Sequence, residues 1–218
     1  MNETSAVKLR PFKYYDYLNG ANLVGSEHYP ELQPVCIIPD EVVGFNEKNS
    51  VKNPEQYYLD HFIDDYHFER VWNNCDKYLA AYRRFKGVIG TDYSVYRDMP
   101  LWVRKYNVGR NRTIAYYLQK NNISIVPVAS WAYLEDFEWC LDGLPKDSSI
   151  AISTNGCMSN FVSKTTFLDG IDLLQEILRP KFLIIAGGPL AELDKKYSNI
   201  RYYKNFSQRL AERRKSGK

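Results

Sequence analysis

Residues 86–101, KGVIGTDYSVYRDMPL, contain the transition around which the rest of the chain is organised. A short apolar run at Val88 and Ile89 stops at Gly90, polar residues run from Asp92 to Asp98, and Pro100 precedes a long helical pattern. In α/β proteins, ligands bind where a strand ends and a polar loop leads into a helix. This segment therefore indicates both the fold class and the place to look for a site.

The same alternation of strand and helix patterns continues on both sides of this segment. We predict strands at 58–63, 88–89, 123–128, 149–152, 182–186 and 200–203, and helices at 68–85, 101–120, 133–141 and 164–178. Strands separated by helices favour right-handed crossovers and a parallel sheet. We expect an α/β fold with a mostly parallel sheet of five to seven strands, because the apolar runs and helical patterns alternate in βα repeats.

Two arrangements of that sheet remain open at this point. Polar clusters follow almost every strand instead of a single switch point, which favours a small or incomplete TIM-barrel-like form. The alternative is an open doubly wound sheet. We expect one α/β domain over residues 34–205, an irregular N-terminal arm at 1–33 and a basic C-terminal tail at 206–218.

Composition sets limits on the class of protein. The chain is 44% hydrophobic and 25% charged, which is ordinary for a soluble globular protein. No apolar run approaches the ~20 residues of a membrane span, and the stretch MNETSAVKLR lacks the apolar centre of a signal peptide, so we expect a cytoplasmic protein. The four cysteines form no CxxC pair, so their spacing does not indicate a zinc site.

The candidate site residues are those that follow the predicted strands, because parallel strands end at one shared edge. We take Asp92, Asp98 and Arg97 as candidate catalytic residues. The candidate ligand-binding residues are Asp64, Asp65, Ser94, Trp131, Asn155, Gly187 and Gly188. Clustered carboxylates could bind Mg²⁺ or serve as an acid and a base, and an arginine could hold a phosphate or carboxylate. Trp131 offers a flat face to a sugar or a base.

Each of these residues also has a purely structural explanation. Asp65 stands where an aspartate caps a helix, and Asp98 could cap the helix after Pro100 or pair with Arg97. Gly187 and Gly188 suit a tight turn as well as a phosphate loop. His61 and His67 match no zinc spacing.

Three classes of function remain open on the sequence. The first is an enzyme-like domain that binds a phosphorylated or nucleotide-like small molecule at the strand ends. The second is a nucleic-acid-binding accessory protein, suggested by Arg104, Arg110 and Arg112 on the central helix and by the basic tail. The third is a protein-interaction adaptor, which the resemblance given next would place between phage and host proteins. The sequence does not choose among these classes, and it leaves the oligomeric state open.

The motifs also carry a resemblance. They are Asp64-Asp65 with Phe68-Glu69 and Trp72, the run from Asp92 to Pro100, Asn107 with Arg110 and Arg112, Ile125-Val126-Pro127 before Trp131, Gly143-Leu144-Pro145, and the strand that runs into Gly187. Together they make residues 34–203 resemble a family of domains of unknown function found in bacteria, archaea, phages and mobile elements. Gly90-Thr91 stands where that family more often has Ser-Pro. The resemblance implies a phage or mobile-element setting and no reaction.

Overall fold

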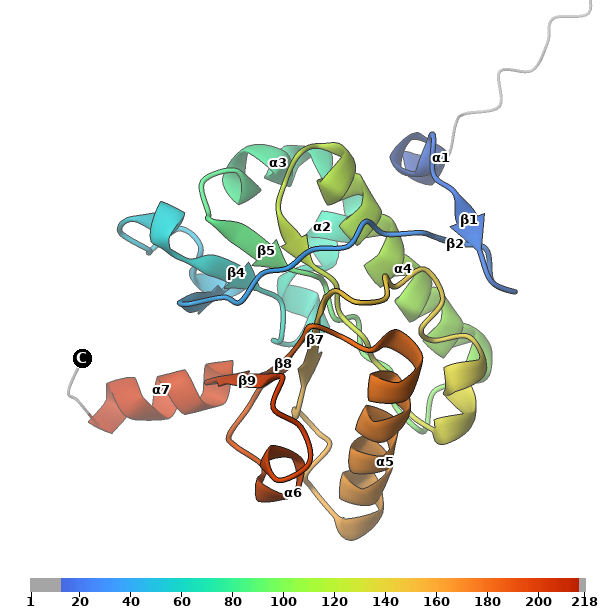
Figure 1. The fold of residues 1–218 in the computed structure, drawn as a ribbon. Coiled ribbons are helices and arrows are strands. Elements are labelled where there is room, and N and C mark those ends of the chain that lie inside the picture. Colours follow the sequence, from blue (N-terminus) through green and yellow to red (C-terminus); the bar gives the residue numbers. More distant parts are fainter. Residues whose placement is uncertain (1–12, 216–218) are drawn as a thin grey trace, which may run out of the picture.

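Two parallel sheets carry the architecture of the computed structural model, which describes residues 13–215 (Figure 1). The first sheet has the order β3-β4-β5-β6, and the second has the order β7-β8-β9. Their strands are β3 (Val42–Gly44), β4 (Tyr58–Asp60), β5 (Gly87–Ile89), β6 (Ile125–Val126), β7 (Ser149–Ser153), β8 (Phe182–Ala186) and β9 (Ile200–Tyr203). Every pairing within these two sheets is parallel, as the alternating sequence pattern predicts.

The two sheets meet beside Pro127. Val128 forms a parallel bridge with Ala151, and the Ala151 N–H donates to the Pro127 carbonyl at 2.8 Å. Pro127 has no N–H to donate, which explains why regular pairing of β6 stops at Val126 instead of continuing to the predicted Val128. The strands predicted at 149–152 and 182–186 are adjacent and parallel as β7 and β8, whereas the strand predicted at 123–128 is shortened to β6 and meets β7 only through the bridge at Val128. The sheets do not close, so the fold is not a clear TIM-like barrel.

Helices connect these strands. The α-helices are α1 (Lys13–Leu18), α2 (Glu69–Asn73), α3 (Asp76–Tyr82), α4 (Leu101–Lys120), α5 (Phe161–Leu178), α6 (Ala191–Asp194) and α7 (Phe206–Lys215). Short 3₁₀ helices occur at η1 (Phe45–Glu47), η2 (Pro54–Gln56), η3 (Asp65–His67) and η4 (Leu134–Glu138). None of the helices in residues 13–215 has both the length and the apolar character needed to cross a membrane.

The helix bounds follow local chemistry. Helix α4 has the predicted bounds, whereas the helix predicted at 68–85 is divided because Asn74 is extended (φ −163°, ψ 84°). Helix α5 begins three residues before the predicted Lys164. The Asn160 side chain caps it by accepting the Ser163 N–H at 2.9 Å.

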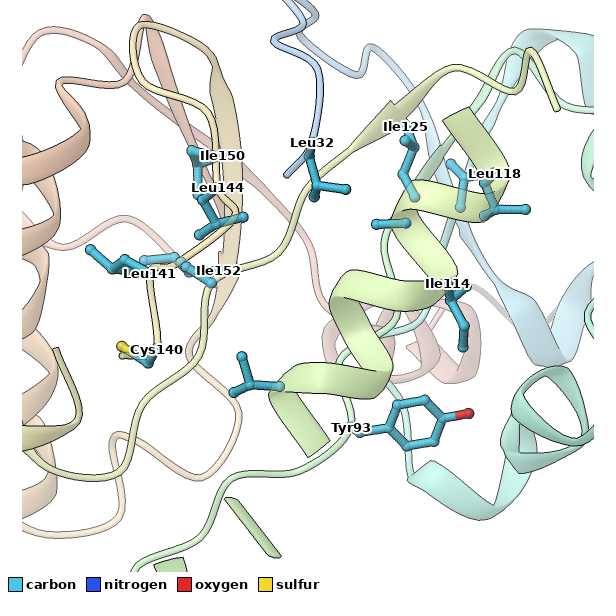
Figure 2. Packing of buried hydrophobic residues seen from close by; sticks show 14 of the residues in the cluster. Leu32, Tyr93, Ile114, Leu118, Ile125, Cys140, Leu141, Leu144, Ile150 and Ile152 are labelled. Atoms are coloured by element: carbon cyan, nitrogen blue, oxygen red, sulfur yellow. The ribbon is translucent and has the colours of Figure 1, made fainter. Parts of the chain in front are cut away.

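Apolar side chains cover both faces of the second sheet. The stripe on α5 formed by Phe167, Ile171, Leu174 and Leu178 is buried in the same cluster as Ile150, Ile152, Leu183 and Ile185. Residues that alternate with these along the strands, Ala151, Ile184 and Ala186, face a second cluster with Ile89 and Val126 of the first sheet. Figure 2 shows the larger cluster, with Ile114 and Leu118 of α4 near Ile125 and with Ile150 and Ile152 of β7.

The N-terminal arm is built into the fold. It contains α1 and the antiparallel pair β1 (Leu23–Val24) and β2 (Tyr29–Pro30), and then crosses past α4 toward the first sheet (Figure 1). The N–H groups of Val35 and Ile37 donate to the hydroxyls of Ser148 and Ser149, each at 2.9 Å. The segment that follows the arm thus binds the chain where β7 begins, at the end opposite to the predicted site.

Candidate functional site

The carboxyl ends of the parallel strands surround a cavity of about 710 Å³. Segments that follow β4, β5, β6 and β7 line it, together with the first turns of α5 and α7. The predicted site residues that the structure brings to this cavity are Asp64, Asp92, Ser94, Arg97, Trp131 and Asn155. Asp65, Asp98, Gly187 and Gly188 are not among the lining residues.

Asp92 is the partly buried carboxyl group of the cavity. Desolvation by burial and, to a smaller extent, the nearby Asp65 carboxyl raise its pKa to about 7, against the opposing effect of a hydrogen bond with the Ser130 side chain. A carboxyl group with a pKa near neutrality can both donate and accept a proton at physiological pH. Asp92 therefore has the protonation chemistry of a general acid or base.

Asp65 organises the loop that carries Asp92. Its carboxylate accepts the Ser94 N–H at 3.1 Å and the Ser94 hydroxyl at 2.9 Å. Burial raises the pKa of Asp65, and the two hydrogen bonds from Ser94 oppose that rise. Asp65 thus stands behind the cavity wall, where it holds the loop after β5 against η3.

Arg97 brings a positive charge to the cavity. Its guanidinium donates to the Thr166 hydroxyl on α5 and lies 5.2 Å from the centre of the Tyr133 ring. The Tyr133 hydroxyl donates to the Arg97 carbonyl at 2.9 Å, which fixes the backbone at this position. The neighbouring Asp98 is exposed.

Trp131 and Asn155 each combine a place in the cavity wall with a structural contact. The Trp131 ring stacks on Phe167 with centroids 5.9 Å apart, and Gly170 leaves the space that its indole edge fills. Asn155 donates to the Phe62 carbonyl at 3.2 Å and accepts from the Asn205 side chain at 3.1 Å. Asn155 therefore ties the end of β7 to the segments after β4 and β9.

The two glycines after β8 serve close packing. A Cβ on Gly187 would lie 2.3 Å from the Thr154 hydroxyl oxygen, and its φ of 155° suits glycine. The Gly187 N–H donates to the Tyr203 carbonyl at 2.9 Å. Helix α6, which follows, is only four residues long.

The three arginines of α4 point into the protein. Arg104 pairs with Asp136, and Arg110 binds both carboxylate oxygens of Glu69 at 3.0 and 2.8 Å. Arg112 is 2% exposed and donates to the carbonyls of Val128, Cys140 and Asp142. The guanidinium groups that suggested a nucleic-acid surface are thus buried and bound within the protein.

The lining residues that were not selected from the sequence include Ser130, Cys157 and Thr166. Ser130 lies two positions after the predicted strand at 123–128, so the strand-end rule that selected Asp92 could have found it. Burial and the Asp92 carboxyl raise the pKa of Cys157 to about 12, which keeps it a thiol. Thr166 lies inside a helix, and no sequence signal marks it as facing Arg97.

The histidines and acids do not form a metal centre among residues 13–215, where no group of three or more His, Cys, Asp or Glu side chains could hold a metal ion. His61 is buried, and burial lowers its pKa to about 4. Its neutral ring donates from Nδ1 to the Ile89 carbonyl at 2.9 Å and accepts the Tyr82 hydroxyl at 3.0 Å. His61 thus has a structural role, while His67 lies at the cavity wall.

A family match covers the strands and the cavity loops together, from residue 21 to residue 204. The chain belongs to the family described as Domain of unknown function (DUF4417). This confirms the resemblance that the motifs carry.

Two curated relatives come from phages. The chain is 31% identical over 163 residues to the "Gene 1 protein" of Mycobacterium phage D29, a match covering 72% of this chain and 59% of that protein. It is 30% identical over 169 residues to the "Gene 1 protein" of Mycobacterium phage L5, covering 76% of this chain and 72% of that protein. The match thus spans less than two thirds of the D29 protein. No solved structure matches the chain.

Proposed function

We propose that this chain is an enzyme-like domain that binds a sugar-containing or phosphorylated small molecule of nucleotide size at the carboxyl edge of its strands. The observation that carries the proposal is the convergence of polar side chains from separate loops on one cavity of about 710 Å³. That volume lies within the roughly 300–1,000 Å³ of small-molecule sites. Such sites sit at this edge in parallel α/β folds.

The roles of the lining residues follow from their chemistry. Asp92 transfers a proton to or from the ligand, because its pKa of about 7 lets it exchange protons near neutrality. Arg97 holds an anionic group with the guanidinium donors that Thr166 leaves free. Asp64 accepts hydrogen bonds from ligand hydroxyls, and Trp131 forms part of the wall.

We also infer a barrel-like course for the strands beyond the two hydrogen-bonded sheets. Support comes from the bond between Asn155 and the Phe62 carbonyl and from the rings of Phe62 and Tyr203, whose centroids are 6.4 Å apart. These contacts draw the ends of β4, β7 and β9 together. The two phage relatives support a setting in an infected bacterial cell, and we place the protein in its cytoplasm.

The test compares Asp92→Asn with the parent by isothermal titration calorimetry, using ribose 5-phosphate and the common ribonucleoside monophosphates. We expect at least one compound to bind the parent and Asp92→Asn to lose binding while it still melts cooperatively. Asp98→Asn is the matched control, because Asp98 is exposed and does not line the cavity. An unchanged isotherm for Asp92→Asn, or no binding to the parent by any compound, would overturn the proposal.

A further inference from the structure

The charged side chains of the cavity wall restrict how many negative charges a bound ligand can carry. Among the described residues that line the cavity, the charged side chains are Asp64, Asp92 and Arg97, with His67 as an additional titratable group. Arg97 is the one lysine or arginine in that set. A ligand with several negative charges would meet two carboxyl groups and a single guanidinium, and like charges close together repel.

Arg97 can accommodate one phosphate group. Part of its guanidinium is already used, since it donates to the Thr166 hydroxyl. An arginine has five N–H donors, so enough remain for a bidentate contact with one phosphate. The second and third phosphates of a triphosphate would find no further cation in the described wall.

The remaining polar wall suits a sugar. Hydroxyl groups line the cavity at Ser94, Ser130, Ser153, Ser163, Thr166 and Ser207. The Ser94 hydroxyl already donates to Asp65 and lies 2.9 Å from the Tyr96 hydroxyl, so its oxygen retains one acceptor position for a ligand. Asp64 is exposed at the wall, and a carboxylate is the group that typically accepts hydrogen bonds from ribose hydroxyls.

Exposed aromatic rings occur near the cavity in three segments, namely η3, the loop after β5 and the start of α5. Tyr96 lines it and is 56% exposed. Tyr66 is 72% exposed, and its ring centroid lies 4.0 Å from that of the lining His67. Phe161, at 83% exposure, lies in the sequence between the lining residues Cys157 and Ser163. Planar bases stack on such rings.

These observations rest on the proposed function and sharpen it: we propose that the cavity binds a nucleoside or a nucleoside monophosphate and discriminates against the corresponding triphosphate. The sugar contacts the hydroxyls and Asp64, a single phosphate contacts Arg97, and the base lies against the exposed rings. A nucleic-acid strand is disfavoured as the occupant, because the arginines of α4 that could track its backbone are buried.

The experiment measures binding of the four ribonucleosides, their 5′-monophosphates and their triphosphates to the full chain by calorimetry in the presence of EDTA. We expect a nucleoside or its monophosphate to bind, and the triphosphate of the same base to bind about tenfold more weakly or not at all. Arg97→Gln should weaken binding of the monophosphate about tenfold while leaving binding of the nucleoside nearly unchanged. Lys86→Gln is the matched control, because it removes one positive charge from a residue that pairs with Asp40 and is absent from the cavity wall.

The outcomes separate this inference from the proposed function. Triphosphate binding as tight as monophosphate binding would overturn the inference alone. Binding of ribose 5-phosphate without any nucleoside or nucleotide would also overturn it while leaving the proposed function intact. If neither the nucleoside series nor ribose 5-phosphate binds the parent, both fail together.

Discussion

Replacing Asp92 with asparagine should stabilise the protein at alkaline pH. Burial raises the pKa of this carboxyl from an ordinary value of 3.8 to about 7, so the folded state binds its proton more tightly than the unfolded state does. The contribution of the protonated carboxyl to stability is therefore complete below pH ~4 and is lost as the pH rises through about 7. Asparagine cannot ionise, so Asp92→Asn avoids this loss.

The size of this gain in stability follows from the shift in the pKa of Asp92. Each pKa unit corresponds to about 1.4 kcal/mol, so a change from 3.8 to about 7 gives at most about 4 kcal/mol at pH 8. The side chain is partly exposed to the cavity, where water screens its charge, and we therefore expect about 2 kcal/mol. At pH 4 the two proteins should differ little, because the carboxyl is largely neutral there in the folded state.

Urea denaturation of both proteins at pH 4, 6 and 8 measures the difference directly. Asp98→Asn serves as the control, since it makes the same substitution at an exposed aspartate outside the cavity wall. The reasoning would be refuted by an Asp92→Asn variant that is less stable than the parent at pH 8, or by a difference that does not grow with pH. A gain in stability together with a loss of ligand binding would mark Asp92 as a residue kept for its chemistry.

Three further predictions concern other parts of the fold. Ile184→Ala should lower the free energy of unfolding by about 2–5 kcal/mol, because Ile184 is buried in β8, and an unchanged denaturation midpoint would show that this strand is not in the core. Arg112→Met should lower the free energy of unfolding by about 3–5 kcal/mol, because three buried carbonyls lose their hydrogen-bond donor. A variant as stable as the parent in the same urea assay would show that these hydrogen bonds do not stabilise the fold. At pH 8, Ellman's reagent should label the exposed Cys36 well before Cys157, because burial raises the thiol pKa of Cys157 to about 12. Equal labelling rates in variants that each keep one of these two cysteines would show that Cys157 is not buried in this way.

The elements that the sequence predicts best are those whose pattern is local. Helix α4 and strands β8 and β9 have the predicted bounds, because an uninterrupted helical pattern or an apolar run defines them without distant partners. The division between α2 and α3 at Asn74 was missed, since the apolar spacing continues through it. The premature end of β6 depends on Pro127, whose effect on pairing the sequence could have shown.

The site residues are harder to predict from the sequence, because their positions depend more on contacts between distant parts of the chain. The strand-end rule selected Asp92, Ser94 and Arg97, which the structure brings to one cavity. It could not distinguish them from Asp98, which is exposed nearby, because a difference of one position in a loop reverses the direction of a side chain. The arginines of α4 suggested a nucleic-acid surface, but the groups that bind Arg104 and Arg110 are Asp136 and Glu69, which are distant in sequence.

The segment that follows the N-terminal arm, with Val35 and Ile37, has a consequence for the order in which the chain folds. Its hydrogen bonds to the hydroxyls of Ser148 and Ser149 join residues 113 and 112 positions apart. Closing a loop of that length costs more entropy than forming local contacts, so these bonds form late. A ribosome adds about 5–20 residues per second, so Val35 and Ile37 wait on the order of ten seconds until Ser148 and Ser149 are made. A segment synthesised well before its partners is thus among the last to settle.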